Sequence, residues 1–170
     1  MGKNNSVILL WTIVLLIFQI LVLNSVYLFG FVNPYVYVFV ILILPIDLRP
    51  WIGLMVAFFL GLTLDTFTDT PGMHMAATLT MAFFRPAVLR LIAPREGYEA
   101  DARPDLGEMG FYWYFRYSGL LVFIHHLLLF YLEVFRFSHF FHTLSRVMLS
   151  WIASMILIFL FQILVQKPQK

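Results

Sequence analysis

The sequence predicts an all-α membrane protein that crosses the bilayer six times. Of its 170 residues, 62% are hydrophobic and only 12% are charged, whereas a soluble domain is about half apolar and about a quarter charged. The mean hydropathy is +0.89. A water-soluble fold of this size cannot bury so much apolar surface. Long apolar segments also alternate with polar breaks, so we expect a single membrane domain over residues 1–170.

The first two spans are expected at residues 7–23 and 34–46. The first is longer than the apolar core of a signal peptide and no small-residue cleavage pattern follows, so we expect it to be retained. Its polar residues Gln19 and Asn24 are expected to bond neighbouring helices, and Pro34 suits a first helical turn. The second span would cover only about 20 Å of the roughly 30 Å hydrocarbon core. It therefore either lies in thinned bilayer or is extended by its flanking residues.

The third and fourth spans are expected at residues 51–64 and 71–92, with a short polar connector between them. Thr70 and Pro71 are typical of a helix start, as the N-cap residue and the first-turn proline. Pro86 interrupts the fourth span. It either kinks that helix or begins a short helix at the membrane interface.

A hydrophilic loop, residues 94–116, precedes the last two spans at 117–135 and 144–165. Up to Gly110 it carries five acidic residues against two arginines. Glycine, proline and mixed charge indicate a solvated loop, and an acidic docking surface is the alternative. The loop ends in an aromatic cluster, Phe111–Phe115, which is typical of the lipid headgroup level.

The lysines and arginines indicate how the chain is oriented. With six spans, nine of the eleven lie on the side of the two termini, and only Arg136 and Arg146 lie on the other side. Positive loops stay in the cytoplasm. We therefore expect both termini in the cytoplasm and the connector after Leu64 on the outside, in the inner (cytoplasmic) membrane.

A row of small residues marks the third span. Gly53, Ala57 and Gly61 follow one another every four residues, and Asp65 and Asp69 continue the spacing. On a helix this spacing makes a single row, and small residues let another helix approach closely within lipid. A carboxylate at a membrane boundary needs a partner. A packing or contact role is therefore favoured over a direct chemical role.

The histidines near the middle of the fifth span invite a chemical interpretation. His125 and His126 are adjacent, and Glu133 lies seven residues beyond His126. On a helix this carboxylate would be about 10 Å away along the axis, too far to share one metal ion. Neutral histidines that bond between helices are the favoured interpretation, and a proton relay is the alternative.

Other candidate metal ligands are sparse. Asp65, Asp69 and His74 could form a divalent-cation site outside the membrane, which is the less favoured interpretation. His139 and His142 suit an interfacial helix surface better than a metal. Cysteine is absent, and neither a phosphate-binding glycine loop nor a serine nucleophile elbow occurs. We therefore expect that the protein binds no metal and no cofactor and that it is not an enzyme. The net charge of +2 does not favour nucleic acid.

The stretch from Gly61 to His74 follows the pattern G-L-x-L-D-x-F-x-D-x-P-G-x-H. With six short spans and cytoplasmic termini, it resembles the MreD family of rod shape-determining membrane proteins. In that family a glycine-rich third span ends in an acid, and a glycine (here Gly72) begins the next span. Pro34 resembles the proline that the family carries before its second span. The loop 94–116 is longer and more acidic than in the family.

The resemblance implies a non-catalytic membrane scaffold of the bacterial cell-elongation machinery. Such a protein associates with the periplasm-facing MreC and, through it, with the MreB filament and the enzymes of peptidoglycan synthesis. The implied fold is similar to the substrate-binding subunits of energy-coupling-factor vitamin transporters. The contact residues would be Gly53, Ala57 and Gly61, with Asp65, Asp69, Gly72 and His74 at the outer turn.

Two other function classes fit parts of the pattern. A small-molecule-binding module, such as a vitamin-uptake subunit, would need a cavity with a few converging polar groups. Its candidate residues are Gln19, Asn24, Asp65, His74 and His125. A membrane enzyme or proton-coupled transporter would use Asp65, His125, His126 and Glu133.

Overall fold

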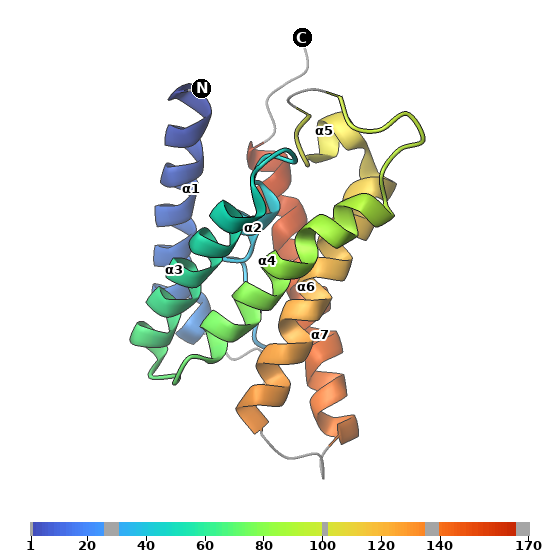
Figure 1. Ribbon diagram of the computed structural model, residues 1–170. Coiled ribbons are helices and arrows are strands. Elements are labelled where there is room, and N and C mark those ends of the chain that lie inside the picture. The colour runs from blue at the N-terminus through green and yellow to red at the C-terminus, as the bar shows by residue number, and fades with distance from the viewer. Residues whose placement is uncertain (1, 26–30, 100–101, 135–139, 166–170) are drawn as a thin grey trace.

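The computed structural model describes residues 2–25, 31–99, 102–134 and 140–165, and the regular elements in these ranges are all helical (Figure 1). The helices are α1 (Gly2–Leu21), the 3-10 helix η1 (Leu23–Ser25), α2 (Phe39–Leu42), α3 (Pro50–Thr68), α4 (Met73–Leu91), α5 (Leu106–Met109), α6 (Phe111–Val134) and α7 (Phe140–Val165). The predicted all-α class is therefore confirmed.

Three of these helices are long and apolar enough to cross a membrane, namely α3, α6 and α7. The apolar part of α1, Leu10–Leu21, is shorter. α4 is as long as α3, but it carries Arg85, Arg90 and His74, which lower its hydropathy. These helices support a membrane protein, whereas the number of crossings stays a prediction.

The outward faces of the helices are apolar. Phe59 and Phe67 of α3 are 57% and 64% exposed, and Ile156 and Leu164 of α7 are 58% and 72% exposed. In water, so many exposed apolar side chains would drive aggregation. Lipid tails are the environment in which such outward faces are stable.

The bundle packs in chain order, with α3 along α4, α4 along α6 and α6 along α7. The beginning of α1 and the end of α7 lie at the same end of the bundle, together with α5 and the turn from α2 to α3 (Figure 1). The turn from α3 to α4 lies at the opposite end.

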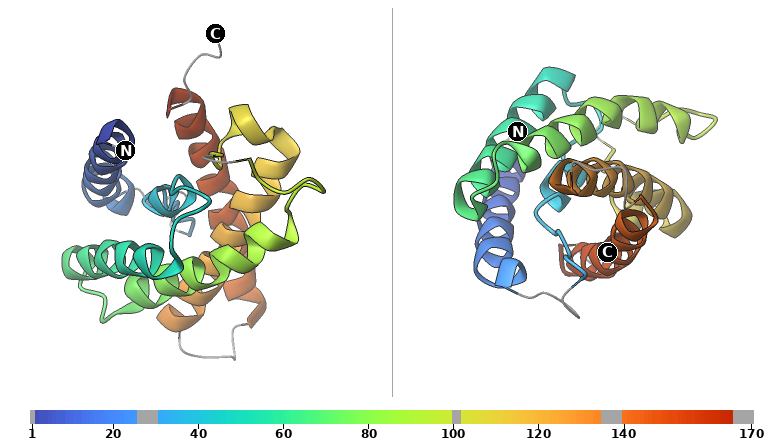
Figure 2. Two further views of the ribbon diagram at one scale, coloured as in Figure 1. Left: turned by 45° about the horizontal axis from the view of Figure 1, so that its top comes forward. Right: turned by 90° about the horizontal axis from the view of Figure 1, so that it is seen from below.

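The prediction that the second span is a helix is wrong. Within residues 34–46 only α2, Phe39–Leu42, is α-helical, and residues 33–36 have no regular structure. We call residues 31–42 the central segment. Seen from below, it lies between α1 on one side and α6 and α7 on the other (Figure 2), and its residues 36–42 are all 0% exposed. Valine, isoleucine and aromatic residues dominate it, and these have only modest helix propensity.

Side chains of distant helices satisfy the backbone of the central segment. Ser150 and Ser154 of α7 accept hydrogen bonds from the Asn33 and Tyr35 backbone N–H groups at 3.1 and 2.8 Å. Gln19 Oε1 accepts from the Val36 N–H at 2.8 Å. Non-helical backbone is tolerated at membrane depth only where protein buries it and supplies partners. These three side chains therefore explain why the segment need not be a helix.

The other spans differ from the prediction mainly at their ends. α3 runs four residues past the expected end at Leu64, α6 begins at Phe111 within the predicted loop 94–116, and α7 begins at Phe140 rather than at residue 144. Pro86 lies inside a continuous α4, so the separate interfacial helix is not formed. Helices can extend beyond their apolar cores because polar and aromatic residues at their ends are favoured in the interfacial region of a membrane.

The hydrophilic loop is partly ordered by its own acids. Asp105 caps α5 by accepting from the Glu108 N–H at 2.9 Å. Glu108 Oε2 accepts from the Arg103 N–H at 2.6 Å. Glu96 and Glu99 are exposed. Part of the acidic character of this loop therefore has a local structural use.

Candidate functional site

The corner between α3 and α4 is built around the Asp65 carboxylate. Asp65 lies in the last turns of α3 and is only 7% exposed. Its Oδ1 accepts from the His74 backbone N–H at 2.9 Å and from Thr70 Oγ1 at 2.6 Å, and its Oδ2 accepts from the Met75 N–H at 2.9 Å. These backbone groups belong to the first turn of α4. Asp65 therefore caps the next helix, where a negative charge is also favoured.

This cap replaces the one that the sequence suggested. Thr70 and Pro71 lie before α4, whose N-cap is Gly72 with no side-chain capping bond of its own. Gly72 has a φ of +80°, and Asp69 has a φ of +53°. Glycine adopts such angles at little cost, and aspartate tolerates them better than most residues. The turn thus depends on backbone conformations at two positions of the motif.

The small-residue row contacts α4 within the same chain. A Cβ placed on Gly61 would lie 2.3 Å from Met75 Cα and 2.5 Å from Thr78 Oγ1. The Thr78 hydroxyl lies 2.9 Å from the Ala57 carbonyl oxygen across the helix pair and 2.8 Å from the His74 carbonyl oxygen of its own helix. Gly53, by contrast, has no atom within 4 Å of its would-be Cβ among the described residues. The close approach is therefore concentrated at Ala57 and Gly61.

A second polar cluster lies inside the bundle and starts from Tyr37 of the central segment. The Tyr37 hydroxyl lies 3.1 Å from His74 Nδ1 and 2.8 Å from His125 Nε2. It donates to one imidazole and accepts from the other, because a hydroxyl carries a single proton. One hydroxyl thereby joins the central segment, α4 and α6.

The cluster continues to α7 through His126. His126 Nδ1 lies 2.9 Å from the Val122 carbonyl oxygen, so this nitrogen carries the proton and donates. In a neutral imidazole the other nitrogen, Nε2, then accepts from the Ser154 hydroxyl at 2.9 Å. His125 and His126 are both 0% exposed. Both histidines thus bond between elements, as the favoured interpretation of the sequence expected.

Gln19 of α1 holds the start of the central segment. Gln19 Nε2 donates to Asn24 Oδ1 at 3.0 Å and to the Pro34 carbonyl at 3.3 Å. Pro34 lies in the non-helical part of the segment and not in a first helical turn. Its carbonyl is free for Gln19 because no helix follows directly.

The candidate metal ligands do not converge. Among the described residues, no three histidine or acidic side chains form a group that could hold an ion. The His74 ring faces Tyr37, and only its backbone N–H reaches Asp65. Glu133 forms an ion pair with Arg146 at 3.0 Å, whereas Arg136 and His139 lie outside the described residues.

Sequence reasoning missed Tyr37 and Ser154 of the buried cluster, and it also missed the buried Arg85 of α4. Tyr37 was hidden in a segment taken for a helix, and Ser154 looked like an ordinary residue of an apolar span. Arg85 is only 5% exposed although it is charged. It did leave a signal, because an arginine inside a predicted span is costly and needs partners.

These features define a helical, membrane-type bundle with a capped corner at one end and a buried hydrogen-bonded cluster in the middle. Comparison with protein-family models, with curated proteins and with solved structures finds no match.

Proposed function

We propose that this protein is a non-catalytic membrane scaffold that associates with a periplasm-facing, MreC-like protein. Through that partner it would connect the MreB filament to peptidoglycan synthesis and so control cell shape. The proposal rests on the MreD-like pattern from Gly61 to His74 and places the protein in the inner membrane with both termini in the cytoplasm.

The observation that carries the proposal is how the residues of this pattern are used. Gly61 permits the close approach of α4, Asp65 caps that helix, and Gly72 supplies a positive φ. Both oxygens of Asp65 accept hydrogen bonds from the protein itself. The pattern thus builds a fixed corner in which both oxygens of the buried Asp65 carboxylate are used by the protein itself, which favours assembly over catalysis.

Six crossings are part of the proposal. The beginning of α1 and the end of α7 lie at the same end of the bundle, which supports an even number of passes (Figure 1). The six passes would be α1, the central segment, α3, α4, α6 and α7, and we expect their arrangement to resemble that of the vitamin-transporter subunits. The second pass would be the shortest and would depend on neighbouring helices to shield its backbone.

A small-molecule-binding module is the weaker alternative. Its candidate residues Gln19, His74 and His125 lie next to the central segment, but each already bonds to it. A ligand would have to displace these contacts. Mass spectrometry of the purified protein distinguishes this alternative from the scaffold, because a stoichiometric bound metabolite would favour the binding module.

The scaffold proposal is tested by co-purification in mild detergent. The tagged chain is co-expressed with the MreC-like protein of the same genome, and we expect the two to elute together. Gly61→Leu should abolish the association by disrupting the corner, and Gly53→Ala should preserve it. Failure of the unaltered, folded chain to retain the partner would contradict the proposal.

A further inference from the structure

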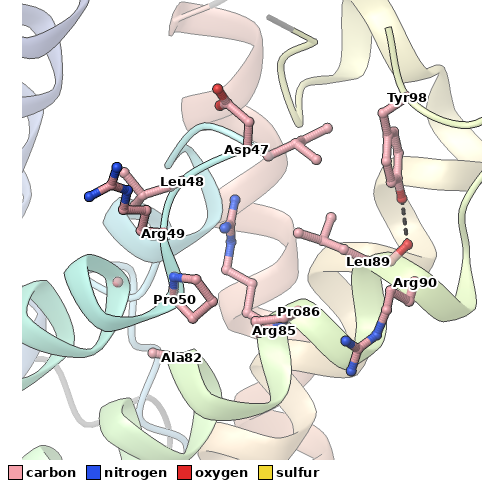
Figure 3. Close-up of a pocket in the computed structure, with 12 residues that line it drawn as sticks. Asp47, Leu48, Arg49, Pro50, Ala82, Arg85, Pro86, Leu89, Arg90 and Tyr98 are labelled. Carbon is pink, nitrogen blue, oxygen red and sulfur yellow. Dashed lines mark hydrogen bonds between the residues drawn. The ribbon is translucent and has the colours of Figure 1, made fainter. Parts of the chain in front are cut away.

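A pocket of about 270 Å³ lies where the turn before α3 meets the C-terminal half of α4 (Figure 3). Three arginines line it. Arg49 precedes α3, Arg85 lies in α4, and Arg90 lies in the last turn of α4. Most of the other lining residues are apolar, including Ile46, Pro50 and Leu89, and Asp47 is the single acidic residue among the described ones that line it. The pocket therefore combines a positive charge with an apolar wall.

Arg85 is held at the bottom of this pocket by neutral groups. Its Nε donates to the Tyr117 hydroxyl at 2.7 Å, and its Nη2 donates to the carbonyls of Leu44 and Pro45. Its Nη1 has no hydrogen-bond partner among the described residues. The guanidinium is thus positioned by its neighbours and still has donors to offer, because arginine carries five N–H groups.

Among the described residues, no carboxylate forms an ion pair with the three arginines, Arg49, Arg85 and Arg90. The Asp47 carboxylate points away from Arg85 (Figure 3). A buried cation without a counter-charge is costly in a membrane protein. An anion from outside the chain would remove that cost.

The surroundings of the pocket are typical of the level of lipid headgroups. Trp51, which follows Pro50, is 60% exposed, as is typical of a tryptophan at the membrane interface. Phe83 and Phe84, which precede Arg85 in α4, are 67% and 43% exposed. Acyl chains could lie against these rings while a headgroup occupies the pocket.

Tyr98 closes the pocket on the loop side without adding negative charge. Its hydroxyl donates to the Leu89 carbonyl at 2.6 Å (Figure 3). Partial burial raises the pKa of Tyr98 above its ordinary value. A phenol is already protonated at neutral pH, and this shift moves its ionisation further away, so Tyr98 adds no negative charge to the pocket.

We propose that this pocket binds a phosphate-bearing anion, with Arg85 at its base and Arg49 and Arg90 at its rim. A phospholipid headgroup and free phosphate share this chemistry. The exposed aromatic rings beside the pocket favour the lipid, and basic pockets between membrane helices are suited to anionic headgroups. At about 270 Å³, the pocket suits a headgroup better than a larger cofactor. This site is independent of the proposed scaffold function.

The test measures binding to the full chain purified in mild detergent. Short-chain phosphatidylglycerol, phosphatidylcholine with the same acyl chains, and inorganic phosphate are each titrated, and the unfolding temperature reports binding. We expect phosphatidylglycerol to bind roughly tenfold more tightly than phosphatidylcholine. If inorganic phosphate competes at equal concentration, the free anion is the ligand. If it does not compete, the ligand is the lipid.

The arginine dependence of binding is tested with Arg49→Gln combined with Arg90→Gln. Both side chains are exposed, so their loss should leave the fold intact. We expect phosphatidylglycerol to bind roughly thirtyfold more weakly, since the double variant loses two arginines that contribute about 1 kcal/mol each. Arg116→Gln is the matched control, because Arg116 is also exposed but does not line the pocket. Unchanged binding by the double variant, equal loss in the control, or equal binding of both lipids would overturn the proposal.

Discussion

The Asp65 side chain caps α4 although it lies nine residues before His74, whose backbone it binds. Its two oxygens reach the backbone N–H groups of His74 and Met75, which no carbonyl within α4 can satisfy. The neighbouring Asp69 has a different task, since it only occupies a left-handed position at the end of α3. The two acids of the motif should therefore respond differently to the same change.

Replacing Asp65 by asparagine should lower the free energy of unfolding by about 1–2 kcal/mol. An amide offers a single acceptor oxygen in place of two, and it loses the charge that the start of α4 favours. Asp69→Asn is the matched control and should have little effect, because asparagine also tolerates a positive φ. Thermal unfolding in detergent measures both. Equal effects of the two variants would show that Asp65 is not a cap.

Tyr37 is the residue on which the buried cluster depends. Tyr37→Phe keeps the ring but leaves His74 Nδ1 and His125 Nε2 without their shared partner. Because unsatisfied buried polar groups are costly, we expect a loss of roughly 1–3 kcal/mol in stability. Tyr112→Phe, at a site that is 80% exposed, serves as the control. If the two variants unfold at the same temperature, the hydroxyl does not hold the cluster together.

At the scale of elements, the pair α3–α4 depends on where its glycines lie. Gly61→Ala would force a methyl group into the backbone of Met75 and should destabilise the protein by about 1–3 kcal/mol. Gly53→Ala meets open space and should stabilise α3 by up to about 1 kcal/mol, through helix propensity. We expect the unfolding temperature to fall for Gly61→Ala and to rise for Gly53→Ala, each relative to the unaltered chain. A loss of stability for Gly53→Ala as large as that for Gly61→Ala would contradict close packing that is concentrated at Ala57 and Gly61.

The elements also show how far sequence reasoning reaches. α3, α6 and α7 were predictable because their apolar segments are long and bounded by polar residues. The central segment was not predictable, since the pattern of a short apolar run does not distinguish a buried helix from a buried non-helical segment. What keeps it non-helical is the set of partners on other helices, Ser150, Ser154 and Gln19. Such partners are defined by tertiary packing and not by local sequence.

The candidate site was predictable to a similar degree. The row that ends in Asp65 was visible as a pattern, and so was the need for a partner of that carboxylate. The identity of the partner was not visible, because it depends on how the turn at Asp69 and Gly72 folds back. Likewise, the sequence indicated that His125 and His126 bond between helices, but it could not indicate Tyr37 as the bridge.

For the whole molecule, one arrangement in the membrane explains three features. These are the apolar outer faces, the buried polar cluster, and the common end of the bundle at which α1 begins and α7 ends. The Asp65 corner lies at one end of the bundle, and the arginine-lined pocket lies near the other (Figures 1 and 3). The scaffold proposal requires the corner to face outward. The lipid proposal requires the pocket to lie at the opposite headgroup level. Both depend on how the bundle sits in the membrane.

Cysteine labelling tests that arrangement most directly, because the chain contains no cysteine of its own. Thr66→Cys, beside the corner, and Glu96→Cys, in the hydrophilic loop, each introduce one thiol at an exposed position. A maleimide that does not cross the inner membrane should label Thr66→Cys in intact cells and Glu96→Cys only after permeabilisation. The reverse pattern, or labelling of both sites in intact cells, would contradict the account.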